Sequence, residues 1–206
     1  WENRLEDGIW TYHLEEVEYG LQSCYRALVE NIQSQYQCKV KKFATIGISA
    51  MMHGYLAFDK DGQLLAPFRT WRNTCTQEAA SILSAEFNFN IPQRWSIAHL
   101  YQLMLDKASH LQQLDYLTTL AGYVHWKLTG NRVLGIGDAS GMFPVDGRAG
   151  NYNVSMLNTF NRFVEKSGFS WRLEKVLPQV LKAGDSGGQL TEAGAKWLDP
   201  TGVLEA

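Results

Sequence analysis

The sequence is poor in cysteine and has no excess of positive charge. Cys24, Cys38 and Cys75 form no CxxC pair and no even-numbered set, which indicates a reducing compartment and predicts a cytoplasmic protein. Nineteen Lys and Arg against twenty-one Asp and Glu give a net charge of -2, which argues against a nucleic-acid partner. No apolar run approaches the roughly 18 residues that cross a bilayer, so we expect no membrane partner either.

What is present is enough apolar material for one domain. The 206 residues are 45% hydrophobic and 12% aromatic, which supports a single core of good size. The chain opens at Trp1 without an initiator Met, and it stops at Ala206 without a closing element. We therefore expect an internal piece of a longer protein.

Hydrophobic periodicity and turn residues predict a mixed α/β chain with its strands early and its helices late. We expect a buried strand at 43–49 and a short strand at 133–136. The turn Asp59–Gly62 predicts an antiparallel hairpin that pairs 55–58 with 64–68. The helices are predicted over 14–36, 76–83, 96–105, 116–128, 154–166, 171–177 and 191–198.

Several catalytic motifs are incomplete. Gly47-Ile-Ser-Ala-Met51 lacks the last glycine of a nucleophile elbow, so a hydrolase is not favoured. The five histidines form neither H-x-x-x-H nor H-E-x-x-H, which predicts no metal site. The glycine pair of Gly135–Gly141 lacks the Gly-Lys-Ser/Thr of a P-loop, and a simple tight turn is the favoured interpretation. Asp138 within it could present oxygen atoms to a ligand.

Two short segments carry side chains suited to a hydroxylated ligand. His53 follows a predicted buried strand, at the kind of sheet edge where open α/β folds bind ligands. Trp71-Arg-Asn-Thr74 places an indole, a guanidinium and an amide together, and such groups stack on sugar C–H surfaces and grip hydroxyls. On these four residues alone, a surface loop with one buried tryptophan is the favoured interpretation.

The order of the motifs resembles the amino-terminal domain of the FGGY carbohydrate kinases, and most closely the xylulokinase branch. Members read I-G-I-S-x-Q-M-H-G, then D-x-x-G-x-x-L-x-P, then W-x-D-x-R. Here the matching stretches are Ile46–Gly54, the hairpin 58–62 with Pro67, and Trp71–Asn73. Further on, residues 121–130 are similar to D-Y-L-x-x-x-L-T-G, and 138–141 read D-A-S-G. The resemblance covers nearly the whole chain.

Three positions depart from the family pattern. Met51 replaces a glutamine, Asn73 replaces an aspartate, and Cys75 stands where the arginine would be. We therefore expect a different sugar or an unusual arrangement of hydroxyls.

The resemblance implies an actin-like, ribonuclease-H-like α/β domain, a mixed sheet flanked by helices with its first strands missing here. Residues 1–206 would be most of the amino-terminal, sugar-binding domain, with the carboxy-terminal ATP-binding domain absent. The implied activity is ATP-dependent phosphorylation of a sugar or polyol hydroxyl, and it is compatible with a homodimer. ATP and Mg²⁺ would be bound mainly outside this chain, and the catalytic base is expected after Ala206.

By resemblance, the substrate-binding residues are Met52, His53, Trp71, Asn73 and Asp138. His53 would orient a hydroxyl, Met52 would supply an apolar floor, and Trp71 with Asn73 would close one side. We expect His53, Trp71 and Asp138 to face one cleft. Two alternatives stay open, namely a non-catalytic sugar-binding or regulatory module and an actin-like ATPase without a sugar substrate. Motifs in the flanking sequence would separate them.

Overall fold

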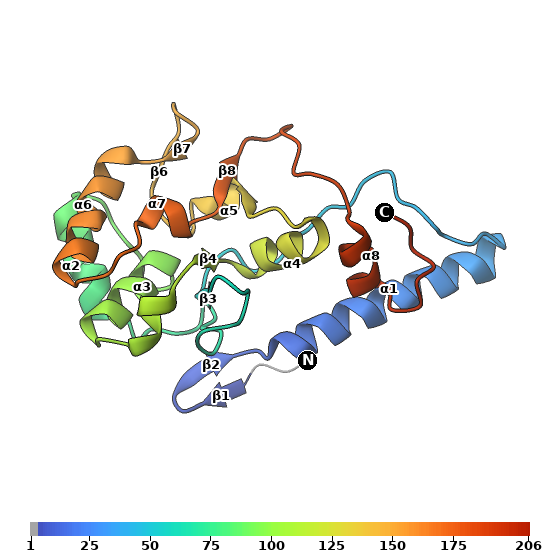
Figure 1. Ribbon diagram of the computed structural model, residues 1–206, viewed down its shortest axis with the longest axis horizontal. Helices are drawn as coiled ribbons and strands as arrows, with labels where there is room; N and C mark the ends of the chain where they lie inside the picture. The colour runs from blue at the N-terminus through green and yellow to red at the C-terminus, as the bar shows by residue number, and fades with distance from the viewer. Residues whose placement is uncertain (1–3) are drawn as a thin grey trace.

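The computed structural model describes residues 4–206 as helices around short strand pairs (Figure 1). The strands are β1 Arg4–Glu6, β2 Ile9–Thr11, β3 Leu56–Phe58, β4 Tyr116–Thr118, β5 Val133–Gly135, β6 Val145–Asp146, β7 Asn151–Tyr152 and β8 Gln179–Leu181. The helices are α1 Leu14–Tyr36, α2 Gln77–Phe87, α3 Ser96–Leu105, η1 Ser109–Gln113, α4 Leu120–Thr129, α5 Ile136–Ala139, α6 Val154–Lys166, α7 Leu173–Val176 and α8 Glu192–Leu198.

The strands pair two by two, with both parallel and antiparallel partners. β5 pairs with β8 in parallel, while β1–β2, β3–β4 and β6–β7 are antiparallel. On its other edge, β3 receives the chain after the Asp59–Gly62 turn. The N–H of Leu65 donates to the Ala57 carbonyl at 2.9 Å, and Tyr55 exchanges two hydrogen bonds with Arg69. The predicted hairpin is therefore confirmed, although its second arm is joined by isolated bridges rather than by a continuous strand.

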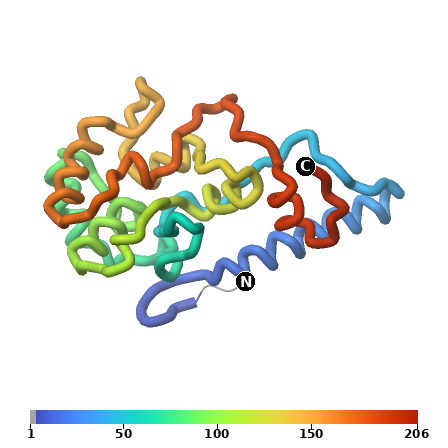
Figure 2. The backbone as a smooth tube through the Cα atoms, viewed as in Figure 1, coloured from blue at the N-terminus to red at the C-terminus, as the bar shows by residue number. Residues whose placement is uncertain are grey.

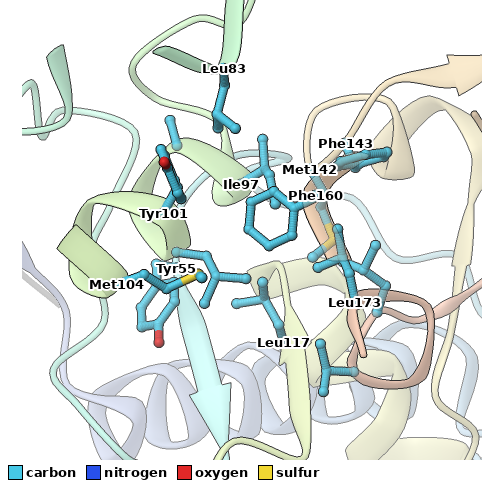
Figure 3. Close-up of a cluster of buried hydrophobic side chains, with 14 of the residues drawn as sticks. Tyr55, Leu83, Ile97, Tyr101, Met104, Leu117, Met142, Phe143, Phe160 and Leu173 are labelled. Atoms are coloured by element: carbon cyan, nitrogen blue, oxygen red, sulfur yellow. The ribbon is translucent and has the colours of Figure 1, made fainter. Parts of the chain in front are cut away.

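The β3–β4 pair separates two hydrophobic clusters. Side chains alternate between the two faces of a strand, so Ala57 and Leu117 belong to one cluster, and Leu56 and Phe58 to the other. The larger cluster packs against α2, α3, α6 and α7, and Figure 3 shows its central side chains. The smaller one is covered by α1, α4 and α8. The β3–β4 pair thus lies between two groups of helices.

The predicted strand at 43–49 is wrong. The segment has no strand pairing and is largely exposed, with Phe43 and Ile46 at 37% and 44% of full exposure. Figure 2 shows this light-blue segment returning from the far end of α1 toward the body. An apolar, β-branched run forms a strand only where another backbone pairs with it. Within residues 4–206, no strand runs beside this one.

The predicted helix over 116–128 is wrong at its start. Residues 116–118 form β4 against β3, and the helix begins at Leu120 after Thr119, whose hydroxyl accepts the N–H of Gly122. Residues 116–124 are all buried, so their apolar pattern did not separate strand from helix. The stretch Gly135–Gly141, which we read as a tight turn, contains the short helix α5. The elements β1, β2, η1, β7 and β8 were not predicted.

Candidate functional site

His53 is held by one hydrogen bond that fixes its tautomer. Its Nδ1 lies 3.2 Å from the main-chain oxygen of Gly141. A carbonyl oxygen can only accept, so Nδ1 carries the proton and Nε2 keeps its lone pair. Nε2 has no partner among the described residues and is not sealed from solvent. It can therefore accept a hydrogen bond from a hydroxyl group.

The electrostatic surroundings keep His53 neutral. Burial is the largest effect and lowers the pKa of the imidazole, and the nearby Arg94 lowers it further. The hydrogen bond to Gly141 acts in the opposite direction but does not outweigh them. A neutral imidazole with a free Nε2 is suited to bind a hydroxyl at neutral pH.

Two glycines bring the segment of His53 close to its neighbours. Gly54 has a φ of 114°, and a Cβ there would lie 2.5 Å from the main-chain oxygen of Arg69. At Gly141, a Cβ would lie 2.7 Å from His53 Nδ1 and 2.9 Å from the main-chain oxygen of Met52. Both positions need glycine because the approach leaves no room for a side chain.

Asp138 belongs to α5 and lies three residues before Gly141. The N–H of Gly141 donates to the Asp138 carbonyl at 3.0 Å, so the two residues belong to one turn. Asp138 is half-buried, and burial raises the pKa of its carboxyl group. Met52 precedes His53 in the chain and is 37% exposed, which leaves an apolar side chain at the surface beside the pair.

Trp71 and Asn73 line an open cleft of about 740 Å³ between their loop, one face of α2 and residues 90–94. Trp71 is half exposed, so part of its indole is accessible. Asn73 is buried, and its amide is fully used by main-chain groups. It accepts the N–H of Trp10 at 2.9 Å and donates to the carbonyls of Trp10 and Thr70 at 2.8 and 2.9 Å. In this structure Asn73 therefore fixes the loop of Trp71 against β2.

Sequence reasoning missed Arg94. This residue lines the cleft of Trp71 and Asn73, and its charge also acts on His53. His53, Met52 and Asp138 are not among the residues lining that cleft. The predicted site residues therefore form two groups rather than one shared cavity, and Arg94 is the residue that relates to both. No signal in the sequence marks Arg94, because it lies in an ordinary polar connection between two helices.

The described residues give no indication of a metal centre or a membrane segment. Within 4–206, no three His, Cys, Asp or Glu side chains gather closely enough to hold an ion. The helices in this part of the chain are also too short or too polar to cross a bilayer. The arrangement at His53 and Trp71 thus offers hydrogen bonds, an aromatic face and a cation.

Comparison with protein families gives a match over almost the full length. The sequence model of the "FGGY family of carbohydrate kinases, N-terminal domain" matches residues 2–203. The chain belongs to the FGGY family of carbohydrate kinases. The resemblance seen in the motifs is confirmed, and with it the family.

Individual FGGY kinases are similar to this chain at low identity. The xylulose kinase of Staphylococcus xylosus is 21% identical over 156 residues, which are 71% of this chain and 30% of that protein. The structure matches a xylulose kinase from Lactobacillus acidophilus with a TM-score of 0.72 at 17% identity, covering 95% of this chain and 38% of that one. A gluconate kinase from the same organism gives 0.70 at 16% identity, with the same two coverages.

These likenesses establish the fold, which is the actin-like, ribonuclease-H-like α/β fold predicted from the motifs. The chain spans less than half the length of the FGGY kinases that it matches.

Proposed function

We propose that this chain is the sugar-binding part of an ATP-dependent carbohydrate kinase, which transfers a phosphoryl group to a hydroxyl of a sugar or polyol. The observation that carries the proposal is the neutral, oriented imidazole of His53, with Nδ1 on Gly141 and a free Nε2. Family membership supports the reaction class. The free cysteines in the described part of the chain support a cytoplasmic location.

Phosphoryl transfer depends on positioning, because the protein has little covalent chemistry to perform. A sugar carries several similar hydroxyls, so the site must fix which one faces the phosphate. In our proposal, His53 Nε2 accepts a hydrogen bond from one sugar hydroxyl. This bond sets the direction of the lone pairs on the hydroxyl oxygen. Asp138 of α5 offers a second acceptor, and Met52 provides apolar contact.

The cleft side of the site would hold the body of the sugar. Trp71 offers an accessible indole face for C–H surfaces, and Asn73 contributes by holding the loop of Trp71 in place. Both residues line the cleft, and Arg94 lines it as well. The charge of Arg94 also acts on His53. The proposal therefore assigns binding and orientation to this chain.

ATP and Mg²⁺ would supply the phosphoryl group and neutralise its charge when bound. The described residues include no metal-ligand cluster and no P-loop, so they do not fit these groups, and we derive no step through them. We propose that ATP, Mg²⁺ and the aspartate base are held by parts of the kinase outside residues 1–206.

A paired assay tests the proposal. The complete kinase is screened with ATP against neutral and acidic sugars and polyols, while residues 1–206 alone are tested in the same coupled assay and by calorimetry. We expect turnover only with the complete kinase and sugar binding by both. Turnover by residues 1–206 alone would contradict our placement of the base. Sugar binding without turnover by the complete kinase would favour the non-catalytic module, and ATP hydrolysis without sugar binding would favour an ATPase.

A further inference from the structure

Ser96 is the first residue of α3, but its hydroxyl does not cap that helix. A serine at the N-cap of a helix accepts a main-chain N–H of the first turn. Here the N-cap position is held by Trp95, which makes no side-chain cap hydrogen bond. The hydroxyl of Ser96 instead donates to the main-chain oxygen of Gly54 at 2.5 Å, across 42 residues of sequence. It therefore joins α3 to the segment that carries His53.

The main-chain oxygen of Gly54 depends on this hydroxyl. Gly54 is buried, and among residues 4–206 no donor other than Ser96 forms a hydrogen bond with its oxygen. A buried carbonyl group that loses its partner costs free energy, so the chain is held where the bond can form. Because Gly54 directly follows His53, the bond fixes the backbone next to the imidazole.

The first turn of α3 also holds the other side of the His53 contact. The N–H of Ile97 donates to the main-chain oxygen of Met142 at 3.1 Å. Met142 directly follows Gly141, whose oxygen receives the hydrogen bond from His53 Nδ1. Two adjacent residues of α3 thus hold the two segments that meet at the imidazole.

The helix α3 is a firm support for these two bonds. Every residue from Ser96 to Met104 is buried, and the apolar side chains of this stretch belong to the larger cluster. Side chains in a close-packed core occupy defined rotamers and have little room to move. A binding group is held precisely when the residues behind it are themselves fixed by packing and hydrogen bonds.

We propose that Ser96 is a positioning residue for sugar binding, which holds the segment of His53 so that Nε2 of the imidazole meets a sugar hydroxyl. This inference rests on the proposed function and adds a residue that does not touch the sugar. Ser96 is fully buried, so it acts through His53 and not by contact with the substrate. Such support matters because a misplacement of about 1 Å can lower the rate of an enzyme about 100-fold.

The test uses the complete kinase and two independent readouts. The variants are Ser96→Ala, Ser96→Thr, His53→Ala and the double variant of Ser96→Ala with His53→Ala. Nitrogen NMR of histidine-labelled protein, recorded without sugar, shows which ring nitrogen of His53 carries the proton, and His53→Ala identifies its signals. Steady-state kinetics with xylulose and with gluconate gives kcat, KM for the sugar and KM for ATP.

We expect Ser96→Ala to release the imidazole. Its NMR spectrum should show both tautomers of His53, whereas the unaltered kinase should show the proton on Nδ1 alone. Its kcat/KM for the sugar should fall about 10-fold, through a higher KM and a lower kcat, with KM for ATP unchanged. Ser96→Thr keeps the hydroxyl and should keep the tautomer. Ser96→Ala should add little to the effect of His53→Ala, because both changes remove the same contact.

Thr191 provides a matched control. Its hydroxyl also donates to a distant main-chain oxygen, that of Leu128, at 3.2 Å across 63 residues, but it lies outside the site. Thr191→Ala should lower the stability of the protein and leave the tautomer of His53 and the sugar kinetics unchanged. If Ser96→Ala behaves in the same way, Ser96 has a purely structural role and the inference is overturned.

A second pair of variants serves if Ser96→Ala does not fold. Ser96→Cys keeps a side chain of similar size with a weaker donor, and Ser96→Thr keeps the hydroxyl. A changed tautomer of His53 in Ser96→Cys alone would support the inference, and an unchanged tautomer would overturn it.

Failure of the proposed function gives a different result. A complete kinase that phosphorylates no sugar or polyol would overturn the proposed function. The NMR signals of His53 are recorded without sugar, so they would still show whether Ser96 holds the imidazole. Normal sugar turnover with unchanged constants in Ser96→Ala would overturn only the role of Ser96.

Discussion

The imidazole of His53 and the main chain of Gly141 hold each other in place across 88 residues of sequence. Gly141 accepts the hydrogen bond that fixes the histidine tautomer, and its missing side chain makes room for the ring. The segment before β3 and the turn after α5 must therefore both be formed before Nε2 can bind a hydroxyl.

Replacing His53 with alanine should weaken sugar binding and alignment together. In the complete kinase we expect His53→Ala to raise KM and lower kcat, because the hydroxyl loses both a contact and its direction. The loss of one substrate hydrogen bond should cost about 1–3 kcal/mol. Steady-state kinetics over a range of sugar concentrations measures both constants.

His125 provides a matched control. It is also a half-buried histidine on a glycine carbonyl, with Nε2 2.9 Å from the oxygen of Gly187, but it lies outside the site. His125→Ala should leave KM and kcat unchanged. If His53→Ala behaves like this control while its fold is intact, His53 is an ordinary structural residue.

Adding one methyl group at Gly141 should reproduce much of the loss of sugar binding expected for His53→Ala. The Cβ of Gly141→Ala would lie 2.7 Å from His53 Nδ1, so the ring must turn away. We expect weaker sugar binding in Gly141→Ala, and a much smaller further effect when it is combined with His53→Ala. Gly137→Ala in the same turn is the control, because nothing lies within 4 Å of its Cβ. Fully additive effects would contradict the proposed coupling.

Restoring the aspartate of the family pattern at position 73 should destabilise this protein. Asn73 donates two hydrogen bonds to main-chain carbonyls and is only 3% exposed. An aspartate has no N–H to donate and would place a charge against those oxygens, so we expect Asn73→Asp to cost roughly 2–4 kcal/mol. Chemical denaturation measures this, and exposed Asn90→Asp should stay within about 0.5 kcal/mol. Equal stability of the two variants would contradict the role assigned to Asn73.

The buried His99 should make the protein sensitive to acid. His99 is fully buried in α3, and neither ring nitrogen has a partner among the described residues. Burial, assisted by Arg69, lowers its pKa to about 3. Between pH 6.5 and 3 the unfolded chain binds a proton that the folded chain does not, so the free energy of unfolding falls as the pH falls. From pH 7 to pH 5 this amounts to about 2 kcal/mol.

Two variants that cannot titrate separate charge from packing at this position. His99→Leu and His99→Gln should each lose about 2 kcal/mol less stability than the unaltered protein between pH 7 and pH 5. Their stabilities at pH 7 should differ from each other, because one buries an apolar and the other a polar side chain. Identical pH dependence in all three proteins would show that His99 is not the sensitive group.

Long periodic segments were predictable from the sequence. The helices α1, α3 and α6 begin and end where the apolar stripes predicted, because each stripe spans several turns and packs against the buried clusters. Short apolar runs were predicted correctly at 55–58 and 133–136 but not at 116–118 and 43–49. Residues 116–118 are a strand because β3 lies beside them, and 43–49 are not a strand because no backbone does.

The hairpin β1–β2, which was not predicted, had a local signal in the sequence. Asp7-Gly8 turns the chain between β1 and β2 with φ angles of 47° and 78°, which is the chemistry of a tight hairpin. The contribution of Asn73 had no local signal in the sequence, because its partner Trp10 lies 63 residues away. The same holds for Arg94, whose role depends on a cleft formed by three separate segments.

The tie between α1 and the end of the chain has a consequence for synthesis on the ribosome. The amide of Gln22 donates to the main-chain oxygen of Trp197, 175 residues later, and Tyr25 packs with Ala195 and Leu204. At roughly 5–20 residues per second, α1 leaves the ribosome about 10–35 s before the segment that covers this face. During that interval its apolar side is open to solvent and to other chains. Nascent copies of this protein should therefore be a substrate for chaperones that hold exposed apolar helices.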